Sequence, residues 1–188
     1  LFTVDRHQKK EETYHLHGAL VCAQYLNTFV RNADIVKMAN MAQIVNVIAP
    51  IMITNDKLWK QAIYYPLQLF AENCYGDALN VFTQCDTFNT NDYKNVPYLD
   101  VSSAYNDKAG ELVINVVNRQ LEKPIETTIV NQFGKLAGKA TVYEVNSGNI
   151  NDKNSLTEQK VKTKTKEISV KENGFIYSFP AHSFTMTK

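Results

Sequence analysis

The sequence predicts an α+β fold, in which a helix–strand–helix segment is followed by an antiparallel β-sandwich. Three observations support this prediction. Apolar residues of the first half recur at helical spacing, a nearly uninterrupted apolar run follows them, and the second half holds short apolar runs separated by Gly, Asn and Asp. We expect the connection between the two parts near Tyr75-Gly76, so that residues 1–74 form the first part and residues 75–188 the second.

The first expected helix begins at Thr13. Apolar residues from Leu16 to Val30 recur at steps of three and four, which is typical of one face of an amphipathic helix. Glu11 and Glu12 precede this stretch and suit the positive end of a helix dipole. A second helix is expected over residues 57–72, where Pro66 should bend or split it.

Between these helices, residues 35–48 are apolar almost throughout and rich in β-branched side chains. Strands buried on both faces have this composition, although a buried helix is the competing assignment, because periodicity alone does not distinguish short apolar runs. The Ala49-Pro50 step would interrupt any helix that crossed it. A β/α unit needs neighbouring strands to complete its sheet, so we expect part of the protein to lie upstream of this sequence.

The second half is predicted to be strands joined by polar turns. Residues 161–168 alternate lysine with threonine and valine, as expected of an edge strand with one fully solvated face. Residues 147–155 are expected to form a polar surface loop that its own contacts do not order. The expected strands cover residues 111–119, 125–130, 140–145, 161–168, 175–179 and 183–187.

Composition limits the classes of partner. The 188 residues are 44% hydrophobic and 21% charged, which suffices for a core without metals or disulfides. A net charge of +1 gives no long-range attraction to nucleic acid, membranes or acidic polymers, and no segment offers about 18 consecutive apolar residues. We therefore expect no nucleic-acid partner and no membrane partner.

The cysteines predict neither a metal site nor a disulfide framework. Cys22, Cys74 and Cys85 form no CxxC pair and are odd in number, so we expect three free thiols. This weakly favours a reducing or thiol-tolerant compartment. His15 and His17 are two residues apart on a predicted helix, so their side chains diverge and cannot share a metal. We predict no cofactor and no metal.

Several segments resemble one known family. The most specific segment is residues 23–51, which contains Met41-Ala42-Gln43-Ile44-Val45-Asn46-Val47-Ile48-Ala49-Pro50. It closely resembles the end of the catalytic barrel in the α-L-arabinofuranosidases of glycoside hydrolase family 51, and the resemblance spans roughly Tyr14 to the C-terminus. Later matches follow in order: Tyr64-Tyr65-Pro66-Leu67, Val96-Pro97-Tyr98-Leu99-Asp100-Val101-Ser102, Val116-Val117-Asn118-Arg119 and Phe179-Pro180-Ala181-His182-Ser183-Phe184-Thr185.

The resemblance implies a (β/α) eight-stranded barrel followed by a β-sandwich, and retaining release of terminal arabinofuranosyl groups from arabinan, arabinoxylan and related glycans. Residues 1–74 would then be the C-terminal remnant of the barrel. Retention requires two carboxyl groups about 5–5.5 Å apart. In the family both are glutamates on earlier barrel strands, one of them in an Asp-Glu-Trp motif.

This sequence departs from the family at those catalytic motifs. Its single tryptophan, Trp59, follows Lys57-Leu58, and the adjacent pair Glu11-Glu12 matches neither motif. We assign no catalytic residue. The parent protein is expected to be an enzyme, whereas this chain alone is expected to be inactive.

One substrate contact is implied by the resemblance. In the family, a glutamine in the Ala-Gln motif of the last barrel strand reaches the bound arabinose, and it aligns with Gln43. A neutral amide can both donate to and accept from sugar hydroxyls, and barrel chemistry lies at the C-terminal ends of strands. Spacing alone instead favours a buried Gln43 satisfied by backbone groups. Asn40 and Asn46 flank it and are weaker candidates.

Three functions remain open. The chain is expected to be the C-terminal part of an arabinofuranosidase that supports the barrel and meets arabinose-containing oligo- or polysaccharides through the parent enzyme. The alternatives are a carbohydrate-binding module with a row of exposed aromatic side chains, and a structural or homo-oligomerisation domain. Trp59 and Tyr64-Tyr65 could stack on sugars but are expected in the core, as is His182. Cytoplasmic and periplasmic locations both stay open. The sandwich aromatics, expected mostly in the core, are Tyr98, Tyr105, Tyr143, Phe175, Tyr177, Phe179 and Phe184.

Overall fold

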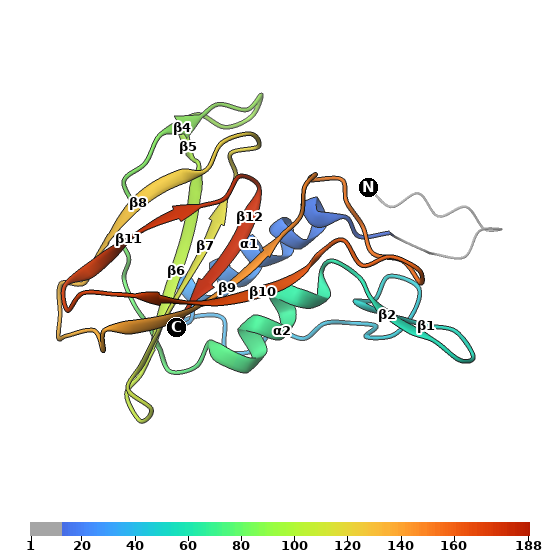
Figure 1. Ribbon diagram of the computed structural model, residues 1–188, viewed down its shortest axis with the longest axis horizontal. Helices are drawn as coiled ribbons and strands as arrows, with labels where there is room; N and C mark the ends of the chain where they lie inside the picture. The colour runs from blue at the N-terminus through green and yellow to red at the C-terminus, as the bar shows by residue number, and fades with distance from the viewer. Residues whose placement is uncertain (1–12) are drawn as a thin grey trace.

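The computed structural model describes residues 13–188 as two helices packed against antiparallel sheets (Figure 1). The predicted α+β class with an antiparallel sandwich is therefore confirmed. Helix α1 spans Leu16–Arg31 and helix α2 spans Tyr64–Asn73. Glu11 and Glu12, expected beside the start of the first helix, lie outside the described residues.

The main sheet has six strands in the order β10-β9-β12-β7-β6-β3, and every neighbouring pair is antiparallel. A two-stranded sheet, β11-β8, lies across from it. The long strands of the main sheet are β6 (Leu99–Asn106), β7 (Glu111–Asn118), β9 (Lys139–Asn146), β10 (Lys162–Ser169) and β12 (Ser183–Thr187), with the short β3 (Asp77–Ala78) at its edge. The remaining strands are β8 (Ile125–Val130), β11 (Gly174–Phe179), and the short pairs β1 (Ile51–Ile53) with β2 (Leu58–Lys60) and β4 (Thr87–Phe88) with β5 (Val96–Pro97).

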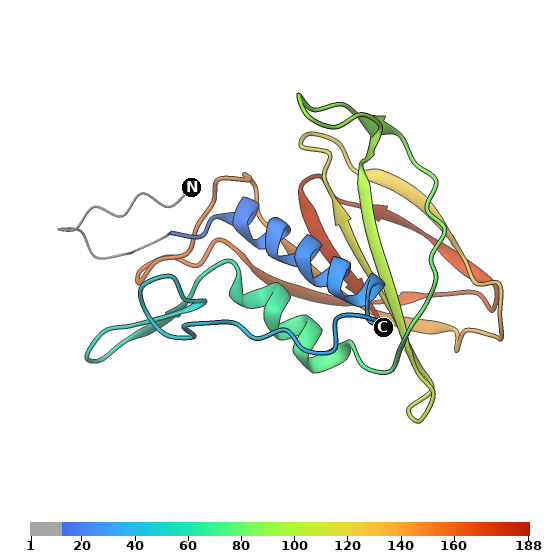
Figure 2. The same ribbon diagram turned by 180° about the vertical axis from the view of Figure 1, so that it is seen from behind.

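The main sheet buries both of its faces. Alternation along β7 sends Val113 and Val117 toward the helices, whereas Val116 faces Tyr177 and Phe179 of β11. Figure 2 shows both helices lying on the first of these faces. Two hydrophobic clusters result, one between helices and sheet and one between the two sheets.

The helix-side cluster joins the two predicted parts of the chain. Phe184 of β12 is fully buried and stacks on Phe70 of α2, with ring centroids 5.5 Å apart. Leu16 and Leu20 of α1 belong to the same cluster. The helices and the sandwich therefore share one core, and the division at residues 74 and 75 stays a prediction about the parent protein.

The start of α1 is completed by a distant loop. The backbone N–H groups of Leu16 and His17 donate to the carbonyl oxygens of Asp152 (2.8 Å) and Ile150 (3.0 Å). These bonds satisfy donors that a helix leaves unpaired at its first turn. The loop over residues 147–155 is thus held by contacts with α1, and its Asn154 is buried, which the prediction of a loose surface loop did not anticipate.

Two predictions for the first half were wrong. Residues 35–48 form no strand, because the described chain offers them no neighbouring strand beyond an isolated parallel bridge between Val45 and Ile51. Residues 57–72 are not one helix, since residues 58–60 pair with β1. Pro66 does not bend α2, because it lies in the first helical turn, where its missing N–H has no intrahelical partner to lose.

The second half follows the predicted strands within one or two residues. β10 lies at the edge of the main sheet and exposes most of its side chains, as its alternating lysines predict. Strand β6 was not anticipated as a strand. It pairs with β7 along its whole length and buries Leu99, Asp100 and Ala104.

Candidate functional site

Gln43, the predicted sugar contact, lies in the segment between α1 and β1. Its side chain is exposed, and its backbone is left-handed with φ 59°. It is therefore not the buried, backbone-satisfied residue that spacing alone favoured. Asn40 is also exposed, and among the residues that the structure describes neither lines a described cavity.

The backbone around Gln43 folds back on β1. The Asn46 N–H donates to the Ile51 carbonyl (2.8 Å), and the Asn46 side-chain oxygen accepts from the Ile53 N–H (2.8 Å). Asn46 and Val47 both have positive φ angles, 59° and 63°. Such a conformation is rare for a β-branched residue and costs on the order of 1–3 kcal/mol. The segment thus holds backbone strain next to the predicted sugar contact.

The same segment exposes apolar side chains. Ile35 is 77% exposed and Met38 is 78% exposed, although both belong to the run predicted to be buried. Isolated apolar side chains on a surface are ordinary, whereas a contiguous set marks an interaction surface. We call this set the apolar segment; it consists of Ile35, Met38, Met41, Ile44 and Val45.

The other residues singled out in the sequence do not gather around Gln43. His15 precedes α1 and pairs with Lys153 through a backbone bridge, and His17 is exposed. His182 lies in the turn before β12, where its ring nitrogens contact the Leu121 and Ser147 carbonyls at 2.7 and 3.3 Å. Trp59 lies on β2, outside both hydrophobic clusters.

A buried polar cluster joins α1 to the main sheet, and sequence reasoning missed it. Asp100 of β6 is 7% exposed and forms ion pairs with Arg31 (3.0 Å) and Arg119 (3.2 Å). It also accepts a hydrogen bond from the Asn27 amide at 2.9 Å, and Asn27 is fully buried. Burial lowers the pKa of Arg119, and the Asp100 carboxylate opposes that shift. We call these four residues the Asp100 cluster.

The Asp100 cluster is structural in character. Arg119 also donates to the Gln24 side chain (2.6 Å) and the Pro97 carbonyl (2.8 Å), so each of its three guanidinium nitrogens has a protein partner. Only the position of Arg31 at the end of a predicted helix could have hinted at the cluster. Its partners lie far away in sequence, so no local pattern connects them.

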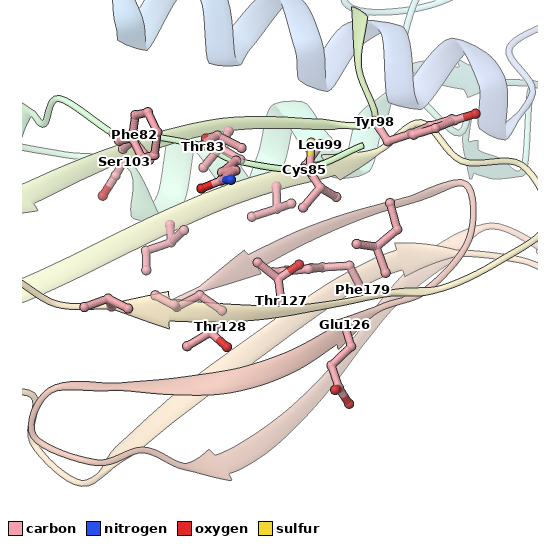
Figure 3. Close-up of a pocket in the computed structure, with 18 of the residues that line it drawn as sticks. Phe82, Thr83, Cys85, Tyr98, Leu99, Ser103, Glu126, Thr127, Thr128 and Phe179 are labelled. Carbon is pink, nitrogen blue, oxygen red and sulfur yellow. The ribbon is translucent and has the colours of Figure 1, made fainter. Parts of the chain in front are cut away.

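A cavity of about 1320 Å³ opens between the two sheets (Figure 3). Cys85 and Leu99 lie on one side of it, and Thr127 and Phe179 on the other. The Thr127 hydroxyl oxygen is buried and, within residues 13–188, has no hydrogen-bond partner. The walls of the cavity are mostly apolar, so the cavity is better suited to hold apolar groups than to carry out acid–base chemistry.

Two features of metal and membrane proteins are missing from the described part of the chain. Residues 13–188 contain no group of three or more His, Cys, Asp or Glu side chains placed to hold a metal ion. None of their helices is long and apolar enough to cross a membrane. The three cysteines are free, and burial raises the pKa of Cys22 to about 12.

Comparison with known proteins decides the family. The family described as the alpha-L-arabinofuranosidase C-terminal domain matches residues 3–183. The chain belongs to this family. Its predicted resemblance to the C-terminal portion of family 51 arabinofuranosidases is thereby confirmed.

Curated relatives of this C-terminal domain are longer proteins. The chain is 35% identical over 189 residues to "Probable alpha-L-arabinofuranosidase C" of Aspergillus clavatus, and the match covers 95% of the chain and 35% of that relative. It is also 35% identical over 120 residues to the intracellular exo-alpha-(1->5)-L-arabinofuranosidase 1 of Bacillus subtilis, covering 63% of the chain and 24% of that relative. The domain thus spans about a quarter to a third of the length of these two relatives.

Solved structures share the fold of the domain. The alpha-L-arabinofuranosidase of Thermotoga maritima, solved as an arabinose complex, superposes with a TM-score of 0.87 at 25% identity, covering 99% of the domain and 40% of that chain. The GH51 enzyme of Thermotoga petrophila gives the same values. The domain therefore has the architecture of a part of these enzymes that makes up about 40% of their length.

Proposed function

We propose that this chain is the C-terminal part of a retaining α-L-arabinofuranosidase that removes terminal arabinofuranosyl groups from arabinan- or arabinoxylan-type glycans. The rest of the enzyme would supply the two catalytic carboxylates, and this part would support the barrel that carries them. Relatives with that activity in their names, and the share of their length that the chain covers, support the proposal.

The apolar segment is the observation on which the proposal rests. A strand of a parallel barrel is covered on both faces and needs partners on both edges. Residues 35–48 have the composition of such a strand but lie exposed in this chain, without a ladder. We infer that they pair with barrel strands of the parent protein, and that pairing removes the positive φ angles at Gln43 and Val47.

The predicted division follows from this inference. Residues 1–74 would belong to the barrel and residues 75–188 to the sandwich. The Asp100 cluster and the shared core would then hold the last part of the barrel firmly against the sandwich. The sandwich would thus fix α1, and with it one end of the segment that carries Gln43.

Activity measurements test this proposal directly. The 188-residue chain should not hydrolyse 4-nitrophenyl α-L-arabinofuranoside, whereas the protein made from its whole reading frame should. Turnover by the pure 188-residue chain, abolished by changing one of its own glutamates, would contradict the assignment of the acids to the rest of the protein.

The role of Gln43 has its own test. In the whole protein, Gln43→Ala should lower kcat/KM by about 5- to 13-fold, because a hydrogen bond to the sugar contributes on the order of 1–1.5 kcal/mol. Gln132→Ala, at an exposed position of the sandwich, is the matched control and should leave kcat/KM unchanged. Equal kinetics for both variants would remove Gln43 from the substrate site.

The exposure of the sandwich aromatics disfavours a free-standing carbohydrate-binding module on a sheet face. Tyr177, Phe179 and Phe184 are buried, while Tyr105 is 37% exposed. Tyr98, Tyr143 and Phe175 are partly buried. Formation of homo-oligomers, and the absence of nucleic-acid and membrane partners, stay predictions.

A further inference from the structure

A hollow of about 410 Å³ opens between β2 and the loop that joins β9 to β10. Leu58, Trp59 and Lys60 line one side of it, and residues 154–159 line the other. Figures 1 and 2 both show the β1–β2 hairpin beside this loop. The volume lies within the range of about 300–1,000 Å³ that is usual for small-molecule sites.

Trp59 gives the hollow an aromatic wall. It is the only tryptophan of the sequence, it is partly exposed, and it belongs to neither hydrophobic cluster. Its expected place in the core is therefore wrong, because residues 58–60 form a hairpin strand instead of a helix face. Among the described residues, none accepts a hydrogen bond from its indole N–H, which leaves that donor available to solvent or a ligand.

The opposite wall is polar except for Leu156, and it is held in place by hydrogen bonds. The buried Asn154 side chain donates to the Lys60 carbonyl (3.0 Å) and the Val161 carbonyl (2.7 Å), and it accepts from the Val161 N–H (2.8 Å). The Gln159 amide donates to the Tyr65 hydroxyl. These bonds fasten the loop to β2 and α2, and Ser155, Thr157, Glu158 and Gln159 of the loop line the hollow.

The charges around the hollow are already paired. The Glu158 carboxylate lies 3.6 Å from the Lys160 ammonium, and the Lys60 ammonium lies 4.2 Å over the Tyr64 ring. Neither sign of charge dominates, so the site fits a neutral ligand better than a phosphate or a cation. An aromatic face with amide, hydroxyl and carboxylate groups opposite it matches the mixed apolar and hydroxyl surface of a sugar ring.

We propose that this hollow is a second saccharide-binding site, which holds one or two glycosyl units of a neutral glycan on the face of Trp59. The Glu158 carboxylate accepts hydrogen bonds from the sugar hydroxyls, and the Gln159 amide donates hydrogen bonds to them. The site deepens the proposed function, on which it rests for the class of glycan. It would retain a polymeric substrate without taking part in bond cleavage.

The single tryptophan makes the proposal directly measurable. Linear α-1,5-arabinotetraose is titrated into the 188-residue chain while tryptophan emission is recorded, with xylotetraose and maltotetraose as comparison sugars. We expect a saturable change in emission with arabinotetraose, at an affinity of about 1 mM or tighter. Isothermal calorimetry on Trp59→Phe, which lacks the reporter, should show binding weakened by about 10-fold.

A matched pair of variants separates this site from adventitious effects. Glu158→Ala should weaken binding by about 10-fold, because a hydrogen bond to a charged group is lost. Glu172→Ala, at an exposed glutamate that also pairs with a lysine, should bind like the unchanged chain. Circular dichroism checks that each variant is folded.

Two results would overturn the proposal: no saturable response to any of the three sugars at tens of millimolar, or binding that Trp59→Phe and Glu158→Ala both leave unchanged. The titration involves no turnover. A chain that binds sugar while the whole protein lacks arabinofuranosidase activity would contradict the proposed function alone, and active protein without this binding would contradict the second site alone.

Discussion

Replacing Asp100 by asparagine tests whether its cluster holds α1 on the sandwich. The carboxylate is 7% exposed and is shared by Arg31, Arg119 and the Asn27 amide, at 3.0, 3.2 and 2.9 Å. Asp100→Asn keeps the shape but removes the negative charge and one acceptor. It leaves two guanidinium groups facing each other, one of them with a pKa already lowered by burial.

The expected loss of stability is about 2–3 kcal/mol. Removing one partner of a fully buried ion pair costs about 3–5 kcal/mol. Arg31 is 38% exposed and Arg119 is 22% exposed, so water screens part of that cost. With a urea dependence of about 2–3 kcal/mol per molar for a chain of this size, the unfolding midpoint should fall by about 1 M. The melting temperature should fall by roughly 4–12 °C.

Urea unfolding followed by circular dichroism and by the emission of Trp59 measures this change. Glu172→Gln is the matched control, because its ion pair with Lys135 has a similar length, 3.0 Å, but is exposed on both sides. It should cost less than about 0.5 kcal/mol. If the two variants shift the midpoint equally, the Asp100 cluster contributes no more than a surface pair, and its proposed role in fixing α1 fails.

Two further predictions concern the helix-side core. Phe184→Ala should destabilise the chain by about 3–5 kcal/mol, because a fully buried ring stacked on Phe70 is replaced by a cavity, and calorimetric melting would show it; a loss below about 1 kcal/mol would mean that the site collapses freely. The Cys22 thiol, whose pKa burial raises from 9.0 to about 12, should react with a disulfide reagent at pH 9 far more slowly than glutathione does, and should match it in denaturant. The pKa of the Cys22 thiol is higher in the folded chain than in the unfolded chain, so its contribution to the free energy of unfolding should be complete below pH 9. This contribution should decline as the pH approaches 12, and Cys22→Ala should reduce the decline.

The fold of the second half was largely predictable from sequence. Each strand there is covered on at least one face by its own chain, so alternation of side chains and turn residues determined the structure. Residues 35–48 show the opposite case: composition alone indicated a strand, but a strand also needs partners along both edges, and the described chain provides only the bridge at Val45. Similarly, residues 58–60 satisfy a helical spacing but pair with β1 instead.

Some of the residues discussed as functional could be found from the sequence, whereas others come together only in the folded chain. The assignment of Gln43 came from a family resemblance and stays a prediction, since its surroundings in this chain lack the strands that would place it. The Asp100 cluster escaped sequence reasoning, because Asn27 and Asp100 meet only once α1 lies on β6. Trp59 was visible in the sequence, but its environment depended on a hairpin that the spacing had hidden.

The contact between the start of α1 and the loop at Asp152 bears on how the protein is made. Helix α1 leaves the ribosome well before the loop at Asp152, yet the carbonyl groups that complete its first turn belong to that loop. Until then α1 has neither those acceptors nor the β12 ring of Phe184 beneath it. Assembly of this part of the protein should therefore be late and concerted, with α1 packing in place only after the final strands have been made.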